Sequence, residues 1–317
     1  MDKLKIWGKI IPYNTGKAKA PDMVIRRWPK WIAMIHWVKD VFGGRIAQDT
    51  RGMDTFTYLD EIKPGKVSAN YDDIPTLTPF LSPGSDIAVI IAPGGGFCNQ
   101  SRQNEGDHIA AFLNQNGISA FVLEYRMNPY RAPVCYLDMQ RAIRYIRYHA
   151  KEYGISPDKI GAMGFSAGGY LTGASLFLLG NKAVEYPGYI PDEVDGENGQ
   201  ADFLGLIYPV VNFDYNQNML ALLAGNDFYD EAERPKLKER FSLTSRMTTS
   251  DVPQFLCYGT KDPIKGAGIY DKKLNALKIP HKTVCIENGG HGFALENKKY
   301  SFWGDEFVKW IREITNE

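Results

Sequence analysis

From residue 86 onward, short continuous apolar runs alternate with longer amphipathic stretches. A continuous apolar run predicts a strand buried on both faces, and strands joined through helices form parallel crossovers. The pattern therefore predicts an α/β fold, with a doubly wound, mostly parallel sheet and helices on both faces. The expected strands cover 86–92, 119–125, 160–164, 203–208, 254–258 and 282–286, and the expected helices cover 103–116, 136–152, 167–179 and 301–315.

The N-terminal part of the chain lacks this alternation. Prolines break any long element there, so we expect irregular structure apart from a short amphipathic helix over 30–42. Residues 1–72 are interpreted as an extension that packs on the core or on a neighbouring subunit. The main domain then covers 73–317. Two insertions in it are expected near the functional site, because loops at the carboxyl ends of a parallel sheet bind substrates; they cover about 181–200 and 211–250.

Charge and composition exclude several classes of function. Lys and Arg total 37, and Asp and Glu also total 37, so the basic excess of a nucleic-acid or anionic-membrane binder is absent. The four cysteines form no CxxC pair, and no His or Cys pair has zinc spacing, so no metal is expected. Cys257 and Cys285 lie in strand-like runs that predict buried, reduced thiols. The N-terminal sequence has no signal-peptide core, which favours a cytoplasmic protein without a membrane partner.

A possible nucleophile lies in Gly164-Phe165-Ser166-Ala167-Gly168-Gly169, which matches the G-x-S-x-G pattern between a short apolar strand and a small-residue helix. The glycines allow neighbouring backbones to approach, so that a tight turn can lift the Ser166 hydroxyl above the sheet edge. The turn also places the Ala167 amide at a helix N-terminus, where unpaired N–H groups favour an anion.

A second glycine cluster, Pro93-Gly94-Gly95-Gly96-Phe97, follows the first strong strand. Consecutive glycines can aim backbone N–H groups at one point, so Gly95 and Gly96 are expected to join Ala167 as an oxyanion hole. Neither cluster fits a dinucleotide or P-loop fingerprint, so no cofactor is expected.

A serine nucleophile requires a base, and His291 is the histidine that follows the last expected strand. Asp262 stands at the carboxyl end of the preceding strand and is the expected acid that orients it. Three other carboxylates remain alternatives to Asp262, namely Asp214, Asp251 and Glu287.

Two charged groups have simpler interpretations. The acidic residues of 192–197 lack calcium-loop spacing and predict a solvated loop. Arg141, Arg144 and Arg147 recur on one helix face and predict a charged, solvent-facing surface with local acidic partners.

Taken together, residues 73–315 resemble the α/β-hydrolase superfamily, and within it the bacterial acetyl-xylan-esterase-like carboxylesterases, whose relatives include feruloyl esterases. The stretches that carry this resemblance are Asp73–Thr78, Pro93–Phe97, Asp138–Arg144, Gly164–Gly169, Tyr208-Pro209 and Gly290–Phe293. The resemblance implies an α/β-hydrolase fold. It also implies a catalytic triad of Ser166, Asp262 and His291.

The expected function is removal of short acyl groups, mainly acetyl, from carbohydrate esters such as acetylated xylo-oligosaccharides. Phe97, Phe165 and Tyr215 are the expected substrate-binding residues, since aromatic rings stack on sugars. A peptidase or amidase of the acyl-aminopeptidase or formamidase type is one alternative, and a non-catalytic binding protein with the same fold is another. A homo-oligomer remains open, because the N-terminal segment is rich in Trp.

Overall fold

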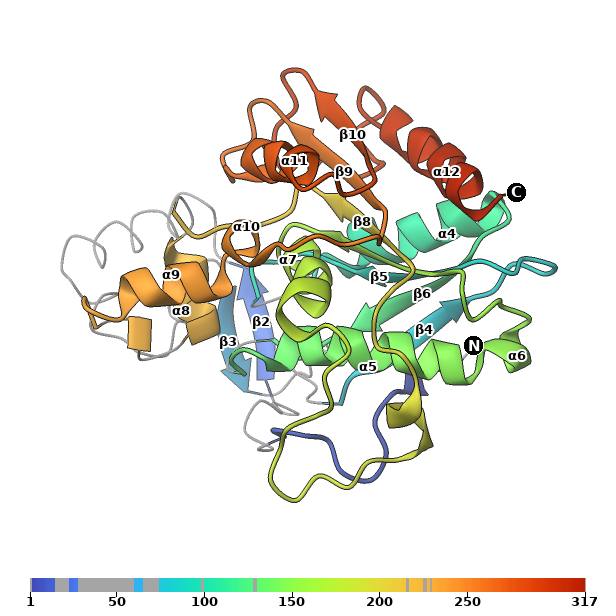
Figure 1. Cartoon of the computed structure of the whole chain (residues 1–317), viewed down its shortest axis with the longest axis horizontal. Coiled ribbons are helices and arrows are strands. Elements are labelled where there is room, and N and C mark those ends of the chain that lie inside the picture. The colour runs from blue at the N-terminus through green and yellow to red at the C-terminus, as the bar shows by residue number, and fades with distance from the viewer. Residues whose placement is uncertain are drawn as a thin grey trace.

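The computed structural model describes residues 2–14, 23–27, 60–64, 74–97, 100–127, 130–214, 217–224, 227–228 and 230–316. Its centre is an eight-stranded sheet, with helices on both faces (Figure 1). The strands lie side by side in the order β1 (Leu4–Lys5), β4 (Thr76–Phe80), β6 (Ser119–Glu124), β5 (Ala88–Ala92), β7 (Ile160–Phe165), β8 (Phe203–Ile207), β9 (Gln254–Gly259) and β10 (His281–Ile286). The expected α/β-hydrolase architecture is therefore confirmed.

The strands from β5 to β10 all run parallel, as the alternating sequence pattern predicts. β1 and β4 run antiparallel at one edge. A separate antiparallel pair joins β2 (Met23–Arg27) to β3 (Asp60–Pro64). Among the described residues, no helix is long and apolar enough to cross a bilayer.

Side chains that alternate along the strands divide the core into two layers. In β5, Ile90 belongs to one hydrophobic cluster, while Val89 and Ile91 belong to the other. The first layer is covered by α5 (Val134–Tyr148), α7 (Ala167–Ala174) and α11 (Ala267–Ala276), and the second by α4 (His108–Gln115) and α12 (Phe302–Thr315). The remaining helical segments are η2 (Gln103–Asp107), α6 (Ala150–Tyr153), η3 (Ser175–Leu179), η4 (Glu193–Gly196), α8 (Gln217–Ala224), α9 (Arg234–Phe241) and α10 (Leu243–Arg246).

The antiparallel edge is a feature that the sequence analysis missed. We expected the region up to residue 80 to be irregular because of its prolines, yet β4 contains Pro79, which pairs in register with Phe121. The strand tolerates a proline because β1 pairs only with Thr76 and Leu77, so Pro79 lies beyond the part of β4 that β1 covers. The expected helix over 30–42 lies outside the described residues.

A buried ion pair ties the N-terminal residues to the core. The side chains of Arg126 and Asp138 are fully buried and approach to 2.6 Å. Asp138 also accepts a hydrogen bond from the indole N–H of Trp7 at 2.8 Å. The residues around β1 therefore share the core of the main sheet.

The arginine row on α5 does not face solvent, contrary to the sequence-based expectation. Arg141 is 2% exposed and contacts Asp192 at 2.6 Å and Asp195 at 3.1 Å. Arg147 is 9% exposed and contacts Asp202 at 2.9 Å. The acidic segment is thus a partner of a buried cationic row and not simply a solvated loop. Sequence periodicity could not reveal this, because the charges meet only in the folded chain.

The same contacts place the segment 181–200 differently from our expectation. Asp202 accepts from the backbone N–H of Ile160, the first residue of β7, so the contact of Arg147 lies at the amino ends of the strands. The segment before it packs along α5 through Asp192. The contacts therefore place this insertion along α5 and toward the amino ends of the strands. The described part of 211–250 forms α8, α9 and α10, which follow the carboxyl end of β8.

The three described cysteines differ in their burial. Cys135 and Cys257 are buried free thiols, whereas Cys285 is exposed, contrary to its expected burial. The difference arises because β10 is the edge strand of the sheet, so one of its faces is incompletely covered. Cys98 lies outside the described residues. Within the described residues, no three His, Cys, Asp or Glu side chains form a cluster that could hold a metal ion.

We predict that Asp138→Ala lowers the free energy of unfolding by about 3–5 kcal/mol, because it leaves a buried guanidinium without its counter-ion. The measurement is urea denaturation followed by fluorescence. The matched control is Glu233→Ala, which breaks the exposed pair with Lys236 and is expected to leave the midpoint unchanged. Equal midpoints for both variants would contradict the prediction.

Candidate active site

Ser166 occupies a strained turn between β7 and α7. Its φ of 52° and ψ of −115° lie where side-chain-bearing residues are rare. Backbone hydrogen bonds fix the turn, since Ser166 N donates to Ile207 O at 3.1 Å, and its carbonyl accepts from Tyr170 N at 3.1 Å and Val210 N at 3.0 Å. The hydroxyl is thereby held at the carboxyl edge of the sheet, as the G-x-S-x-G pattern predicts.

The glycines on either side of Ser166 are required by close backbone contacts. A Cβ on Gly164 would lie 2.2 Å from the carbonyl oxygen of Gly168. A Cβ on Gly168 would lie 2.1 Å from the carbonyl oxygen of Ala92, at the end of β5. Neither oxygen belongs to a flexible side chain that can move away. A side chain at either position would therefore force the backbone to move.

The structure brings the expected base and acid to Ser166. His291 Nε2 lies 2.9 Å from Ser166 Oγ, and His291 Nδ1 lies 2.8 Å from Asp262 Oδ2. Each residue follows a different parallel strand, β7, β9 or β10, so their side chains meet at one edge. The expected acid, Asp262, is thus the carboxylate in hydrogen-bond contact with His291.

Asp262 and His291 differ in how deeply they are buried. Asp262 is 4% exposed, whereas the His291 side chain is 24% exposed. Asp262 Oδ1 also accepts from the backbone N–H of Ile264 at 2.7 Å, which fixes the carboxylate. An imidazole held in this way has one ring nitrogen committed to the carboxylate, and the other faces the serine hydroxyl. The arrangement allows proton transfer from Ser166 Oγ to His291 Nε2.

The expected glycine loop lies against the same serine. A Cβ on Gly94 would fall 2.9 Å from Ser166 Cβ. The Gly94 N–H is already used, because it donates to Glu105 Oε2 at 2.8 Å. The N–H groups of Gly95, Gly96 and Ala167, by contrast, take no hydrogen-bond partner within the described part of the chain. The loop therefore presents unpaired donors beside the Ser166 turn, with the Ala167 donor at the N-terminus of α7.

Two of the expected substrate-binding residues are buried instead. Phe165 is fully buried, and its ring packs on Trp303 at a centroid distance of 6.0 Å. It belongs to the α12 layer of the core, because it precedes the turn and points to the face of the sheet that α12 covers. Phe97 is 2% exposed and packs edge-on against Tyr170. Tyr215 lies outside the described residues.

Glu105 and Tyr208 are site neighbours that the sequence analysis did not assign. Tyr208 follows β8, and its ring packs against the imidazole of His291 at a centroid distance of 4.9 Å. Its hydroxyl donates to the buried Glu105 at 2.8 Å. The stretch Tyr208-Pro209 did contribute to the family resemblance, but nothing local in the sequence connects it to a residue on another loop.

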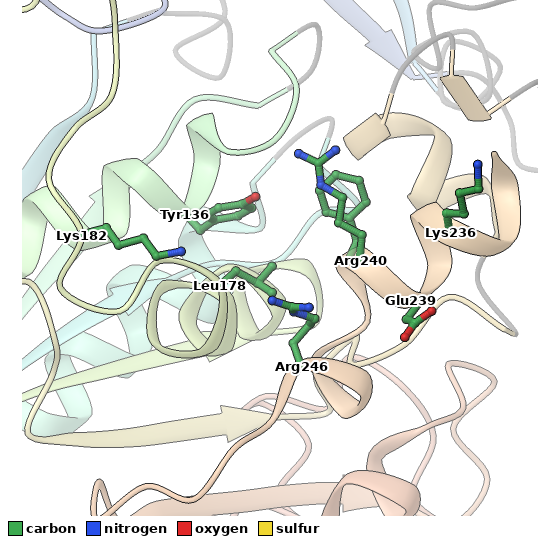
Figure 2. A pocket seen from close by; sticks show the side chains of 8 residues that line it. Tyr136, Leu178, Lys182, Lys236, Glu239, Arg240 and Arg246 are labelled. Carbon is green, nitrogen blue, oxygen red and sulfur yellow. The ribbon is translucent and has the colours of Figure 1, made fainter.

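A separate pocket of about 400 Å³ lies between α5 and α9. Figure 2 shows Lys182 and Arg246 extending toward Leu178 from opposite sides. These cationic side chains are exposed, and neither Ser166 nor His291 lines the pocket. It is a feature of the solvated surface. The residues that line it are Tyr136, Leu178, Lys182, Lys236, Glu239, Arg240, Phe241 and Arg246.

A family model and several known proteins match this chain. The family model BD-FAE matches residues 81–266. The acetylxylan esterase of Xylanibacter ruminicola is 32% identical over 238 residues, which cover 72% of this chain and 45% of that protein. Endo-1,4-beta-xylanase B of Butyrivibrio fibrisolvens is 27% identical over 256 residues, which cover 75% of this chain and 38% of that protein. The chain thus spans less than half the length of these two relatives.

Solved structures show the same fold. An acetyl ester-xyloside bifunctional hydrolase from Caldicellulosiruptor lactoaceticus superposes with a TM-score of 0.64 at 29% identity, over 76% of this chain and 89% of that chain. Esterase 2 of Thermogutta terrifontis, bound to propionate, superposes with a TM-score of 0.59 at 22% identity, over 75% of this chain and 90% of that chain. The second likeness concerns the fold alone.

We predict that Gly168→Ala lowers the free energy of unfolding by about 3 kcal/mol, because the added methyl group overlaps the Ala92 carbonyl and the backbone has to move. The measurement is thermal unfolding by calorimetry. Gly196→Ala is the matched control, since nothing lies within 4 Å of the added Cβ. If Gly168→Ala unfolds at the same temperature as the control, the prediction is wrong, because the close approach is then relieved at little cost in free energy.

Proposed function

The chain belongs to the BD-FAE family, and from that premise we propose that it is a serine carboxylesterase that removes short acyl groups, mainly acetyl, from carbohydrate esters such as acetylated xylo-oligosaccharides. The observation that carries this proposal is the hydrogen-bonded series from Ser166 through His291 to Asp262. It lies beside a loop in which the N–H groups of Gly95 and Gly96 take no hydrogen-bond partner among the described residues. This combination of groups suits acyl transfer.

In the first step, neutral His291 removes the proton of Ser166 as the hydroxyl oxygen attacks the ester carbonyl. Negative charge develops on the carbonyl oxygen, and the N–H groups of Gly95, Gly96 and Ala167 are the proposed donors to it. Such fixed donors favour the transition state because they need no reorganisation when the charge appears. Protonated His291 then gives its proton to the leaving alcohol.

In the second step, water attacks the acyl-serine, and His291 again removes the proton. The tetrahedral intermediate collapses, and the acid, commonly acetate, leaves as Ser166 recovers its proton. Asp262 stabilises the imidazolium in both steps and holds the ring in the tautomer that keeps Nε2 toward the serine. Its burial supports this role, because a charge pair shielded from water interacts more strongly.

Two kinds of evidence support acetylated carbohydrates as the substrate class. One relative is named an acetylxylan esterase and another an endo-xylanase. A solved relative is named an acetyl ester-xyloside bifunctional hydrolase. The same groups would also cleave activated amides, so a peptidase or amidase, or a non-catalytic binding protein, is an outcome that the following tests can reveal.

We predict that Ser166→Ala reduces kcat/KM for p-nitrophenyl acetate by at least about 10⁴-fold, because the nucleophile is removed. A fluorophosphonate probe should label the unaltered protein and not the variant. Ser175→Ala is the matched control, since it removes a buried hydroxyl that donates only to Thr172 O. It is expected to keep both activity and labelling. An unaltered protein without labelling or hydrolysis would indicate a binding protein.

We also predict the order of substrates. The purified protein should hydrolyse acetylated xylo-oligosaccharides with a higher kcat/KM than aminoacyl amides, because an ester carbonyl is more electrophilic than an amide carbonyl. The measurement is acetate or amine release from equal concentrations of acetylated xylo-oligosaccharides, aryl acetates and aminoacyl p-nitroanilides. Faster release from the anilides would favour the amidase alternative over the esterase.

A further inference from the structure

Glu105 is a buried carboxylate without a cationic partner among the described residues. It lies in η2, and both of its oxygens accept hydrogen bonds: Oε2 from the Gly94 N–H at 2.8 Å and Oε1 from the Tyr208 hydroxyl at 2.8 Å. The first donor belongs to the glycine loop beside Ser166. The second belongs to the residue that follows β8. One side chain thus connects two separate parts of the site.

Tyr208 extends this connection to the histidine loop. Its hydroxyl oxygen accepts from the backbone N–H of Ala294 at 3.3 Å, and its ring contacts both His291 and Phe293, with centroids at 4.9 and 4.6 Å. Its own backbone is held by a hydrogen bond to Cys257 O at 2.6 Å, in a left-handed conformation with φ of 36°. A backbone in this region persists only where its surroundings hold it.

The directions of these hydrogen bonds suit an ionised Glu105. Ala294 N–H donates to the Tyr208 oxygen, the Tyr208 O–H donates to Glu105, and Gly94 N–H donates to the second carboxylate oxygen. A protonated carboxyl group would need an acceptor for its O–H, but both groups that contact the Glu105 oxygens act as donors. Burial raises the pKa of Glu105, and the Tyr208 and Gly94 hydrogen bonds and the charge of His291 lower it only in part. Ionisation therefore costs stability as the pH rises through this pKa.

We propose that Glu105 is a positioning residue that, through Tyr208, holds the glycine loop and the histidine loop in register. This inference rests on the proposed function. One hydrogen-bonded unit then sets two things: how Ser166 approaches the ester carbonyl, and where the N–H donors to the carbonyl oxygen lie. A small displacement of either loop would separate nucleophile, base and donors.

Three side chains contact His291, and each follows a different strand. Asp262 follows β9, Tyr208 follows β8 and Ser166 follows β7. Glu105 contacts the Tyr208 hydroxyl, so its effect on His291 is transmitted through the Tyr208 side chain.

The test uses Glu105→Gln, Tyr208→Phe and the double variant. Glu105→Gln keeps the shape but removes the charge and one acceptor, and Tyr208→Phe keeps the ring against His291 but removes the hydroxyl. Tyr270→Phe is the matched control, because it removes a buried hydroxyl that donates at 2.7 Å to Gln254, at the amino end of β9 and away from His291. The readouts are kcat and KM for p-nitrophenyl acetate from pH 5 to 9, and thermal unfolding.

We predict that each single variant lowers kcat by about 10- to 100-fold while KM changes by less than about threefold, because positioning acts on the transition state. The double variant should fall no further than the worse single variant, since both changes break one connection. The control should match the unaltered protein in both kcat and KM.

Several outcomes would overturn the proposal: kcat of either single variant equal to that of the control, a KM that rises as much as kcat falls, or losses that multiply in the double variant. If Glu105→Gln does not fold, Tyr208→Phe alone decides through its kcat. The unaltered protein is assayed and labelled with fluorophosphonate first. Failure there refutes the proposed function and this inference with it, whereas full activity of the unaltered protein and of both single variants refutes only the positioning role.

Discussion

The site depends on the close approach of three backbones at the end of β7. Gly164 and Gly168 allow β7, the first turn of α7 and the end of β5 to come into contact. Ser166 lies between these two glycines in a strained backbone conformation. Sheet hydrogen bonds on both sides of β7 hold this turn in place, including the bond from Ser166 N to Ile207 O. The parallel order of the strands then places the residues that follow β9 and β10 at the same edge.

Three buried carboxylates show how the same chemical group takes different roles. Asp138 is fully paired with Arg126 and stabilises the fold. Asp262 is paired with His291 at 2.8 Å, and in the proposed reaction this imidazole takes up and releases a proton. Among the described residues, Glu105 has only neutral donors, Gly94 N–H and the Tyr208 hydroxyl. A carboxylate kept buried without a cation costs free energy, and its position between two site loops gives a reason for retaining it.

The sequence predicted the parallel strands and the positions of Ser166, Asp262 and His291, because those features follow from local patterns and from chain order. It could not predict β4, whose pairing partner β6 lies about 40 residues along the chain and whose Pro79 argues locally against a strand. It also misjudged Arg141 and Phe165. Both errors concern which face of an element meets a distant segment, and neither hydropathy nor spacing contains that information.

The contacts that hold the fold lie at both ends of the strands, since Arg126, the partner of Asp138, follows the carboxyl end of β6. Trp7 and Asp138 anchor the N-terminal residues on the α5 side, and Arg147 joins Asp202 at the amino ends of the strands. The side chains of Ser166 and His291 meet at the opposite, carboxyl edge. Loops at that edge that leave the pair of Arg126 and Asp138 in place can therefore differ in length and composition. Substrate preference can change there while the hydrogen-bonded series and its supporting turn stay the same.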